Sequence, residues 1–340
     1  MLDLPVQPDL KQLRRQAKDL LGAAKRGDDR ARTRIRAVSD RLILASAQLA
    51  VAREYGFASW PRLKTEIERR EILNGRDLGR MRALLAEDPS LSAEPLDHWC
   101  DHHGAPPLGY MAMLRFDSAR LGLPRDLPGT GEVARALIAA GAPVDGQPGD
   151  RETPLITAAS YGDAEVAKVL IEAGADVDAR SAPDSGGVPG GSALLHAAVF
   201  GMTEVLDLLV EAGAKVTSLE EAAAAGDVSG WLTPDADLQA RIRALVFAAD
   251  HQRLEVIDQL IEAGTPVDAV DEVWGRQALR VAAQHGRPAS VRRLVERGAD
   301  PNLGDADGLT ALDWCQPERS YLDGPHYREV DAILRPLTRS

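Results

Sequence analysis

Cysteine is almost absent from the chain, and the two that occur, Cys100 and Cys315, lie far apart in the sequence. Two distant cysteines cannot build the disulfide framework of a small secreted protein, so we expect a reducing, cytoplasmic location. Long apolar runs are also missing, since no window approaches the roughly 18 uncharged, apolar residues of a membrane-spanning helix. The opening residues, MLDLPVQPDLKQLRRQAKDLL, carry early charges, unlike a secretory signal. We therefore expect no membrane contact.

Sequence patterns of catalysis are missing as well. The glycine-rich stretch PDSGGVPGGS at 183–192 lacks the following lysine and the strand–loop–helix setting of a phosphate-binding loop. The chain has no G-x-S-x-G motif, and its carboxylates are spread along polar segments that imply no pocket to change their pKa values. These absences predict a protein that is not an enzyme and uses no cofactor.

Charge is unevenly spread along the chain, whose net charge is −12. Residues 1–70 hold 16 lysines and arginines against 9 aspartates and glutamates, a net charge of +7. Residues 71–340 hold 24 basic and 43 acidic residues, a net charge of −19. The acidic part is a poor match for the phosphates of nucleic acid, so we do not expect a nucleic-acid partner for it. The basic part could contact nucleic acid, an acidic protein or the acidic part of its own chain.

Four stretches of the chain repeat one pattern: a pair of alanines, a second helical segment and a closing glycine. They are TPLITAASYGDAEVAKVLIEAGADVDA from Thr153, SALLHAAVFGMTEVLDLLVEAGAKV from Ser192, RALVFAADHQRLEVIDQLIEAGTPVDA from Arg243, and QALRVAAQHGRPASVRRLVERGADPN from Gln277. The closing glycines, with one earlier copy, are Gly141, Gly174, Gly213, Gly264 and Gly298. Their separations of 33, 39, 51 and 34 indicate a unit of 33 residues with insertions.

Each unit predicts two helices that cannot be stable alone. The small side chains of Ala158 and Ala159 allow a neighbouring helix to approach the first helix closely. The second helix has apolar residues at i, i+3 and i+4, as at Val166, Val169 and Leu170, which gives it one apolar stripe. Such stripes become buried only when units stack, so the pattern predicts a solenoid.

The unit resembles the ankyrin repeat, which has about 33 residues and a first helix that opens with T-P-L-H-x-A. TPLITA at Thr153–Ala158 is the best match. Other residues replace the histidine of that motif in the four units: Ile156, Leu195, Val246 and Arg280. The hydrogen bonds that this histidine usually makes to the loops must therefore be lost or replaced. The resemblance implies an all-α ankyrin-repeat solenoid, a stack of helix pairs with β-turn or hairpin fingers.

The resemblance also predicts how the chain is divided. We expect an N-terminal helical segment at 1–70 and an array of about seven repeats at 71–340. Insertions near 115–129, 183–189 and 220–240 interrupt the array. Loops on a rigid scaffold often carry specificity, so these insertions are candidates for it.

Ankyrin arrays bind proteins through a concave groove formed by inner helices and finger tips, and the resemblance implies the same here. The inner-helix candidates are Ser160, Tyr161, Val199, Phe200, Asp250, His251, Gln284 and His285, and the finger candidates are Arg180, Trp274 and Asp305. Trp274 is the best single anchor, because it lies in the hydrophilic tip DEVWGR. Alternatively, Tyr161 and Phe200 pack against the next repeat. We expect a monomer whose partner is a protein with a basic or mixed-charge surface.

The first 70 residues resemble a helical segment that precedes ankyrin arrays in bacterial proteins, and the high content of Ala, Arg, Asp and Gly also favours a bacterial source. The segment is expected to cap the array. It could instead bind nucleic acid or an acidic protein through basic residues, or dock on the acidic array and mask its groove. Those basic residues are Lys11, Arg14, Arg15, Lys18, Lys25 and Arg26.

The stretch DHWCDHHG at 97–104 concentrates possible zinc ligands: His98, Cys100, His102 and His103. It lacks both the glutamate next to the first histidine in metalloprotease helices and a second ligand cluster. We expect a polar finger loop without metal there, and metal binding remains the alternative.

Overall fold

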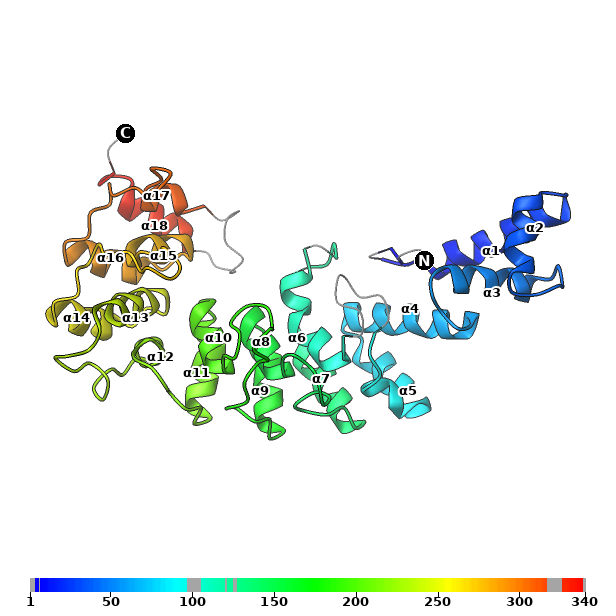
Figure 1. Cartoon of the computed structure of the whole chain (residues 1–340), viewed down its shortest axis with the longest axis horizontal. Coiled ribbons are helices and arrows are strands. Elements are labelled where there is room, and N and C mark those ends of the chain that lie inside the picture. The colour runs from blue at the N-terminus through cyan, green and yellow to red at the C-terminus, as the bar shows by residue number, and fades with distance from the viewer. Residues whose placement is uncertain are drawn as a thin grey trace. The chain divides into compact units, whose positions relative to one another are not determined.

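The computed structural model describes residues 4–5, 7–96, 105–119, 121–124, 127–316 and 326–338. The described residues form helices joined by turns, with isolated β-bridges and no strand, which confirms the all-α prediction. None of the described helices is long and apolar enough to span a bilayer. The chain divides into two compact units, residues 1–146 and 147–340 (Figure 1).

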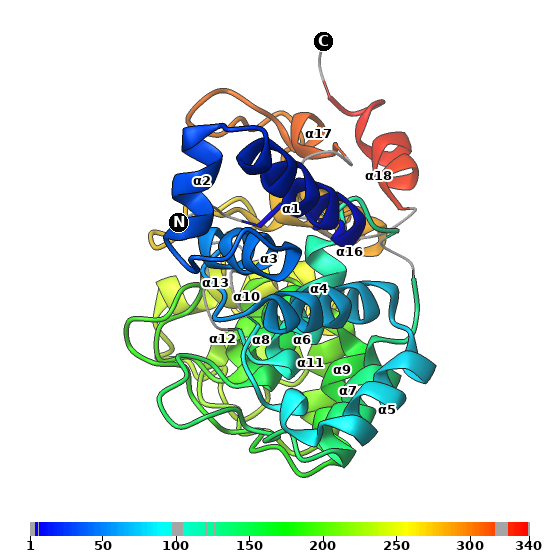
Figure 2. The same cartoon turned by 90° about the vertical axis from the view of Figure 1, so that its right-hand side faces the viewer.

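The first unit begins with four helices: α1 (Leu10–Lys25), α2 (Asp29–Arg36), α3 (Leu44–Glu54) and α4 (Trp60–Gly75). Helix α1 packs against both α2 and α3 (Figure 2), and α3 packs against α4. Their apolar side chains form one hydrophobic core that includes Leu13, Ala17, Leu20, Ala24, Ile35, Ala47, Val51, Phe57, Leu63 and Ile67. The first 67 residues therefore have a core of their own.

Local sequence explains where these helices begin. The side chain of Ser59 accepts a hydrogen bond from the Arg62 N–H, and Pro61 occupies the first turn of α4, where its missing N–H costs nothing. The sequence of helix α2, DRARTRIR, gives only a weak helical pattern, because it offers only Ala31 and Ile35 to the core. An eight-residue helix with so short an apolar stripe depends on the packing of its neighbours.

The rest of the first unit contains α5 (Leu78–Glu87), the short 3₁₀ helix η1 (Pro89–Ser92), α6 (Pro107–Asp117) and α7 (Thr130–Ala139). Helix α4 packs against α5, and α7 packs against both α5 and α6. The predicted boundary at residue 70 falls inside α4, which continues to Gly75. That boundary and the count of seven repeats stay predictions.

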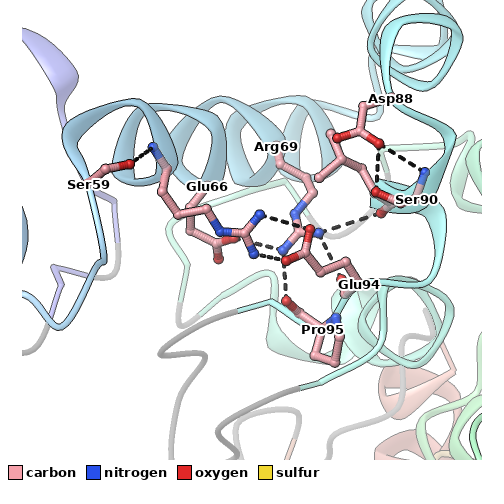
Figure 3. Close-up of polar contacts among 9 residues, drawn as sticks. Ser59, Glu66, Arg69, Asp88, Ser90, Glu94 and Pro95 are labelled. Carbon is pink, nitrogen blue, oxygen red and sulfur yellow. Dashed lines mark hydrogen bonds and ion pairs between the residues drawn. The ribbon is translucent and has the colours of Figure 1, made fainter.

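A buried ionic network holds η1 and the chain that follows it against α4 (Figure 3). Glu66 is 3% exposed and lies between two buried arginines, 2.7 Å from Arg69 Nη2 and 2.9 Å from Arg70 Nε. The Arg69 guanidinium also donates to the carbonyl oxygens of Glu94 (2.7 Å) and Pro95 (2.9 Å). One carboxylate thus fixes the arginine that anchors residues 94–95.

The second unit consists of stacked helix pairs with one exception. The pairs are α8 (Pro154–Tyr161) with α9 (Ala164–Glu172), α10 (Ala193–Val199) with α11 (Thr203–Glu211), α13 (Leu238–Asp250) with α14 (Leu254–Glu262), α15 (Ala278–Gln284) with α16 (Pro288–Glu296), and α17 (Ala311–Trp314) with α18 (Tyr327–Leu334). The predicted apolar stripe is buried, since Val166, Leu170, Val205, Leu209, Val291 and Leu294 are all fully covered.

The exception is the unit that contains α12 (Leu219–Ala225), inside the predicted insertion at 220–240. No helix follows it until Leu238, so α12 lacks the second helix of a repeat. The turn between α13 and α14 contacts α11 instead: Arg253 pairs with Asp207, and the Thr203 hydroxyl lies 2.9 Å from His251 Nδ1. The array is therefore irregular at this unit.

Replacing Glu66 by alanine should destabilise the first unit strongly. The substitution removes the carboxylate that both buried arginines contact, and breaking one side of a buried ion pair costs about 3–5 kcal/mol. The loss should appear as a lower thermal unfolding midpoint in circular dichroism. Glu94→Ala is the matched control, because its pair with Arg62 is partly exposed and should contribute less than about 1 kcal/mol. Equal losses in the two variants would contradict this interpretation.

Candidate partner-binding site

The finger between α14 and α15 presents an exposed tryptophan on a rigid tip. A bridge between Val270 and Gln277 closes the finger. Inside it, the carboxylate of Asp271, 1% exposed, accepts hydrogen bonds from the backbone N–H groups of Val273 (3.0 Å), Trp274 (2.7 Å) and Arg276 (2.7 Å). A carboxylate that satisfies three turn donors fixes the backbone of the tip.

The Trp274 side chain is held in place although it is 44% exposed. Its ring stacks on the buried ring of Phe247 in α13, with 6.0 Å between centroids. The Arg276 guanidinium carbon lies 5.2 Å from the centroid of the same tryptophan ring. Phe247 therefore supplies the local packing that the hydrophilic tip sequence does not reveal.

Further apolar side chains are exposed around this tip. Val273 is 60% exposed, and Val270 is exposed on the same finger. Leu238, at the start of α13, is exposed too, and the Glu272 N–H donates to the side-chain oxygen of the adjacent Gln239 at 3.2 Å. A fixed, exposed aromatic ring with exposed apolar residues on the same finger is the pattern expected of an interaction anchor.

The structure places Asp250, His251 and His285 in the interior, not along a groove. These residues are 1%, 2% and 8% exposed. Asp250 Oδ1 lies 2.6 Å from His285 Nδ1 and 3.6 Å from Arg287 Nε. Buried side chains in such a network cannot touch a partner. We therefore assign these three residues a structural role, which is to hold the surface near the Trp274 finger in place.

The environment of Asp250 keeps it ionised. Burial alone would raise the pKa of this carboxyl group. The charge and hydrogen bond of His285, together with His251 and Arg287, outweigh that effect and hold the pKa well below its usual value. The second unit thus contains a buried negative charge surrounded by donors.

Three side chains from later repeats cover the carboxyl end of α10. His251 Nε2 lies 3.0 Å from the Ala198 carbonyl oxygen, Arg276 Nη1 donates to the Val199 carbonyl (3.0 Å), and Arg287 Nη2 donates to the Gly201 carbonyl (2.7 Å). The last carbonyls of a helix lack partners within it and carry partial negative charge, so N–H donors stabilise them, and the two arginine cations do so most strongly.

These contacts bring five of the predicted site residues into one cluster: Val199, Asp250, His251, Trp274 and His285. Arg276 connects Trp274 to the Val199 carbonyl, and Arg287 connects Asp250 to the same end of α10. Only Trp274 among the five offers an exposed side chain. The cluster therefore fixes where the tryptophan finger lies relative to α10.

Ser160, Tyr161 and Phe200 belong to a second group at α8 and α10. The Ser160 hydroxyl lies 2.8 Å from His196 Nδ1, and His196 Nε2 lies 3.0 Å from the Val188 carbonyl oxygen in its own finger. The ring of Phe200 is 6.2 Å from that of His196. In this unit Leu195 stands where the ankyrin motif has its histidine, and His196 is the next residue. His196 thus makes the loop contacts that Leu195 cannot make. Phe200 and Tyr161 are half-buried.

The remaining candidates serve local structure, except for Arg180. The Gln284 carbonyl accepts a hydrogen bond from the Tyr327 hydroxyl (3.0 Å). Asp305 accepts one from Trp314 Nε1 (2.8 Å) and lies 3.6 Å from Arg280 Nη1. Arg180 is exposed and donates to the Gly190 carbonyl (3.0 Å) across its finger.

Metal binding gains no support from the described residues, which contain no group of three or more His, Cys, Asp or Glu side chains placed to hold an ion. The four candidates His98, Cys100, His102 and His103 lie outside those residues. Leu96 and Ala105, which flank the candidate stretch, form an isolated bridge.

Sequence reasoning missed several residues that build the site: Phe247, Asp271, Arg276 and Arg287. Asp271 could have been found, because an aspartate that opens the turn DEVWG is a usual acceptor for turn N–H groups. The contacts of Arg276 and Arg287 could not be predicted from the sequence, because their acceptors are backbone carbonyls far away in the sequence.

Two stretches of the chain, residues 128–220 and 230–321, match the family described as "Ankyrin repeats (3 copies)". Together they cover more than half of the sequence. The chain belongs to the ankyrin-repeat family. This result agrees with the helix pairs, the finger bridges and the buried stripes of the second unit.

Individual proteins resemble this ankyrin-repeat chain over short stretches. The E3 ubiquitin-protein ligase hecd-1 of Caenorhabditis elegans is 31% identical over 121 residues, which cover 36% of this chain and 4% of the ligase. The putative ankyrin repeat-containing protein of Treponema pallidum (strain Nichols) is 43% identical over 58 residues, which cover 17% of this chain and 20% of that protein. Since this chain covers so little of these relatives, their activities are not transferred to it.

A solved structure described as the human ASB11 ankyrin repeat domain is similar to this chain at 23% sequence identity with a TM-score of 0.32. The alignment covers 68% of this chain and 96% of that domain.

Gly201→Ala should test the packing against Asp250. Gly201 has φ +70°, and a Cβ there would lie 2.8 Å from Asp250 Oδ2, so the buried carboxylate would have to move. We expect a loss of about 2–4 kcal/mol, measured by urea unfolding, from backbone strain plus disruption of the ionic network. The control is Gly174→Ala, where φ is +86° but nothing lies within 4 Å, and the loss should be about 1 kcal/mol. A control loss as large as that of Gly201→Ala would exclude the steric explanation.

Acid should destabilise the second unit through His251. Burial lowers the pKa of His251 to about 4, although Asp250 acts in the opposite direction. The unfolded chain binds this proton near pH 6.5, so the stability that neutral His251 contributes is complete above pH 6.5 and is lost as the pH falls toward 4. The loss should be roughly 3 kcal/mol at most.

Urea unfolding of the intact chain and His251→Gln at several pH values between 7 and 4.5 measures this effect. Glutamine can still donate to the Ala198 carbonyl but does not titrate in this range. The intact chain should lose more stability than the variant as the pH falls. Parallel curves would show that His251 is not the titrating group.

Proposed function

We propose that this protein is a non-catalytic scaffold that binds another protein through the surface around the finger of Trp274. The observation that carries the proposal is the held aromatic ring: Trp274 is exposed, yet Phe247, Arg276 and the Asp271 turn fix its position. Such a side chain loses little conformational freedom when it binds, so its contact area contributes efficiently to affinity.

Ankyrin-repeat folds generally bind proteins and are generally not catalytic, which supports the same class of function. We propose a contact surface that combines the Trp274 tip with the half-buried rings of Tyr161 and Phe200 and with Arg180. Val199, Asp250, His251 and His285 hold this surface in place from within.

Charge favours a basic or mixed-charge partner. Residues 71–340 have a net charge of −19, and exposed carboxylates such as Glu272 lie beside the tryptophan tip. Complementary charge would speed association and make the rate sensitive to salt. The composition and the two distant cysteines also favour a bacterial, cytoplasmic protein, and a monomer remains our expectation.

Trp274→Ala should abolish partner capture. Immobilised intact protein and variants would be incubated with lysate of the source cell, and captured proteins would be quantified by mass spectrometry. Removing a central aromatic anchor typically costs at least about 2 kcal/mol of binding, roughly a thirtyfold weaker complex.

The matched control is Trp231→Ala, which removes another partly exposed tryptophan, outside the α14–α15 finger. Circular dichroism checks that both variants fold. A partner that the intact protein and Trp231→Ala retain but Trp274→Ala loses supports the proposal. A partner retained by Trp274→Ala, or lost equally from both variants, would contradict it.

A further inference from the structure

Helix α1 carries a row of basic side chains that the rest of the chain leaves unpaired. This basic stripe consists of Lys11, Arg14, Arg15, Lys18, Lys25 and Arg26, all exposed. Within the described part of the chain, none of the six forms an ion pair. Neighbouring α2 differs, because its Arg34 binds Glu54 at 2.7 Å.

The stripe covers one side of the helix. At 100° per residue the six positions fall within an arc of about 120°, and Lys11 and Lys25 are about 21 Å apart along the axis. The buried residues Leu13, Leu20 and Ala24 point to the opposite side, into the core. Asp19, the one acidic residue of α1, lies at the edge of the arc.

Folding does not explain the amino-terminal half of this stripe. Lys11 lies in the first turn of α1, where the helix dipole disfavours positive charge by about 0.3–1 kcal/mol, whereas Lys25 and Arg26 at the carboxyl end are favoured by it. Lys11 and Arg15 are also four residues apart, as are Arg14 and Lys18, and like charges at this spacing destabilise a helix by about 0.2–0.5 kcal/mol per pair. Repulsion among the amino-terminal side chains of the stripe opposes helix formation, and an external ligand of opposite charge would relieve it.

The stripe offers charge but no apolar contacts, and this restricts the kinds of ligand that it can bind. The apolar residues of α1 pack into the core, so the helix cannot insert an apolar face into a membrane. It also presents no apolar anchor of the kind that protein interfaces use. Among the described aromatic residues of the first four helices, Tyr55 and Phe57 are buried and Trp60 packs partly against the core, so they form no row of exposed rings on which single-stranded bases could stack. Binding to a nucleic-acid duplex requires neither an apolar helix face, nor an apolar anchor, nor stacking aromatic rings, because contacts to its phosphates are electrostatic.

We infer that the basic stripe of α1 binds the phosphate backbone of double-stranded nucleic acid without reading its sequence. The surface lies in the first unit and is separate from the tryptophan finger, so this inference does not depend on the proposed protein partner. Six contacts to phosphates predict weak binding that falls steeply with salt, with a slope of up to about −5 in a plot of log K against log salt concentration.

The test is fluorescence anisotropy of a labelled 24-base-pair DNA duplex titrated with the full chain at about 50, 100 and 200 mM NaCl. The triple variant Lys11→Gln, Arg15→Gln, Lys18→Gln should bind about tenfold or more weakly at the lowest salt, with a slope reduced by about 2.7. The control variant Lys64→Gln, Arg82→Gln, Lys168→Gln removes the same charge from exposed positions outside α1 and should bind within about threefold of the intact chain.

Thermal unfolding separates this role from a structural one. Because the triple variant relieves repulsion within α1, its unfolding midpoint should equal or exceed that of the intact chain. A lower midpoint, no duplex binding by the intact chain at the lowest salt, or an equal loss in the control variant would each overturn the inference. Stronger binding to vesicles that contain anionic lipid, or to polyglutamate, than to the duplex would overturn it in favour of a membrane or an acidic protein.

Discussion

Asp250 carries a negative charge inside the second unit, and the arrangement of its neighbours follows from the need to compensate that charge. A lone buried carboxylate is very costly, so His285 and Arg287 must lie beside it. Arg287 in turn reaches the Gly201 carbonyl, which ties the turn after α15 to the turn after α10. With His251 and Arg276 on the adjacent carbonyls, the end of α10 becomes the point where several repeats meet.

Much of the fold follows from the sequence, because the features that define a repeat are local. Gly174 after a helix and the stripe of Val166 and Leu170 obey rules of capping and helical period that can be read from adjacent residues. Helix α2 could not be predicted in this way, since it offers only two residues to a core formed by other helices.

The candidate site was less predictable, because its contacts join residues far apart in the sequence. Trp274 could be singled out as an aromatic residue in a polar tip, but Phe247, which holds it, looks like any core residue of α13. His251 and His285 occupy positions that face the groove in a regular array. Here the unit of α12 lacks its second helix, and the turn after α13 contacts α11, so His251 is enclosed.

The arginine contacts at α10 also bear on how such a protein can evolve. In a regular solenoid each unit touches only its neighbours, so one unit can be duplicated or removed without disturbing contacts among the others. Arg276 and Arg287 bind carbonyls 77 and 86 positions away, across two intervening units. Deleting either of those units would separate donors from acceptors, so the units between α10 and α16 cannot be lost singly without breaking these hydrogen bonds.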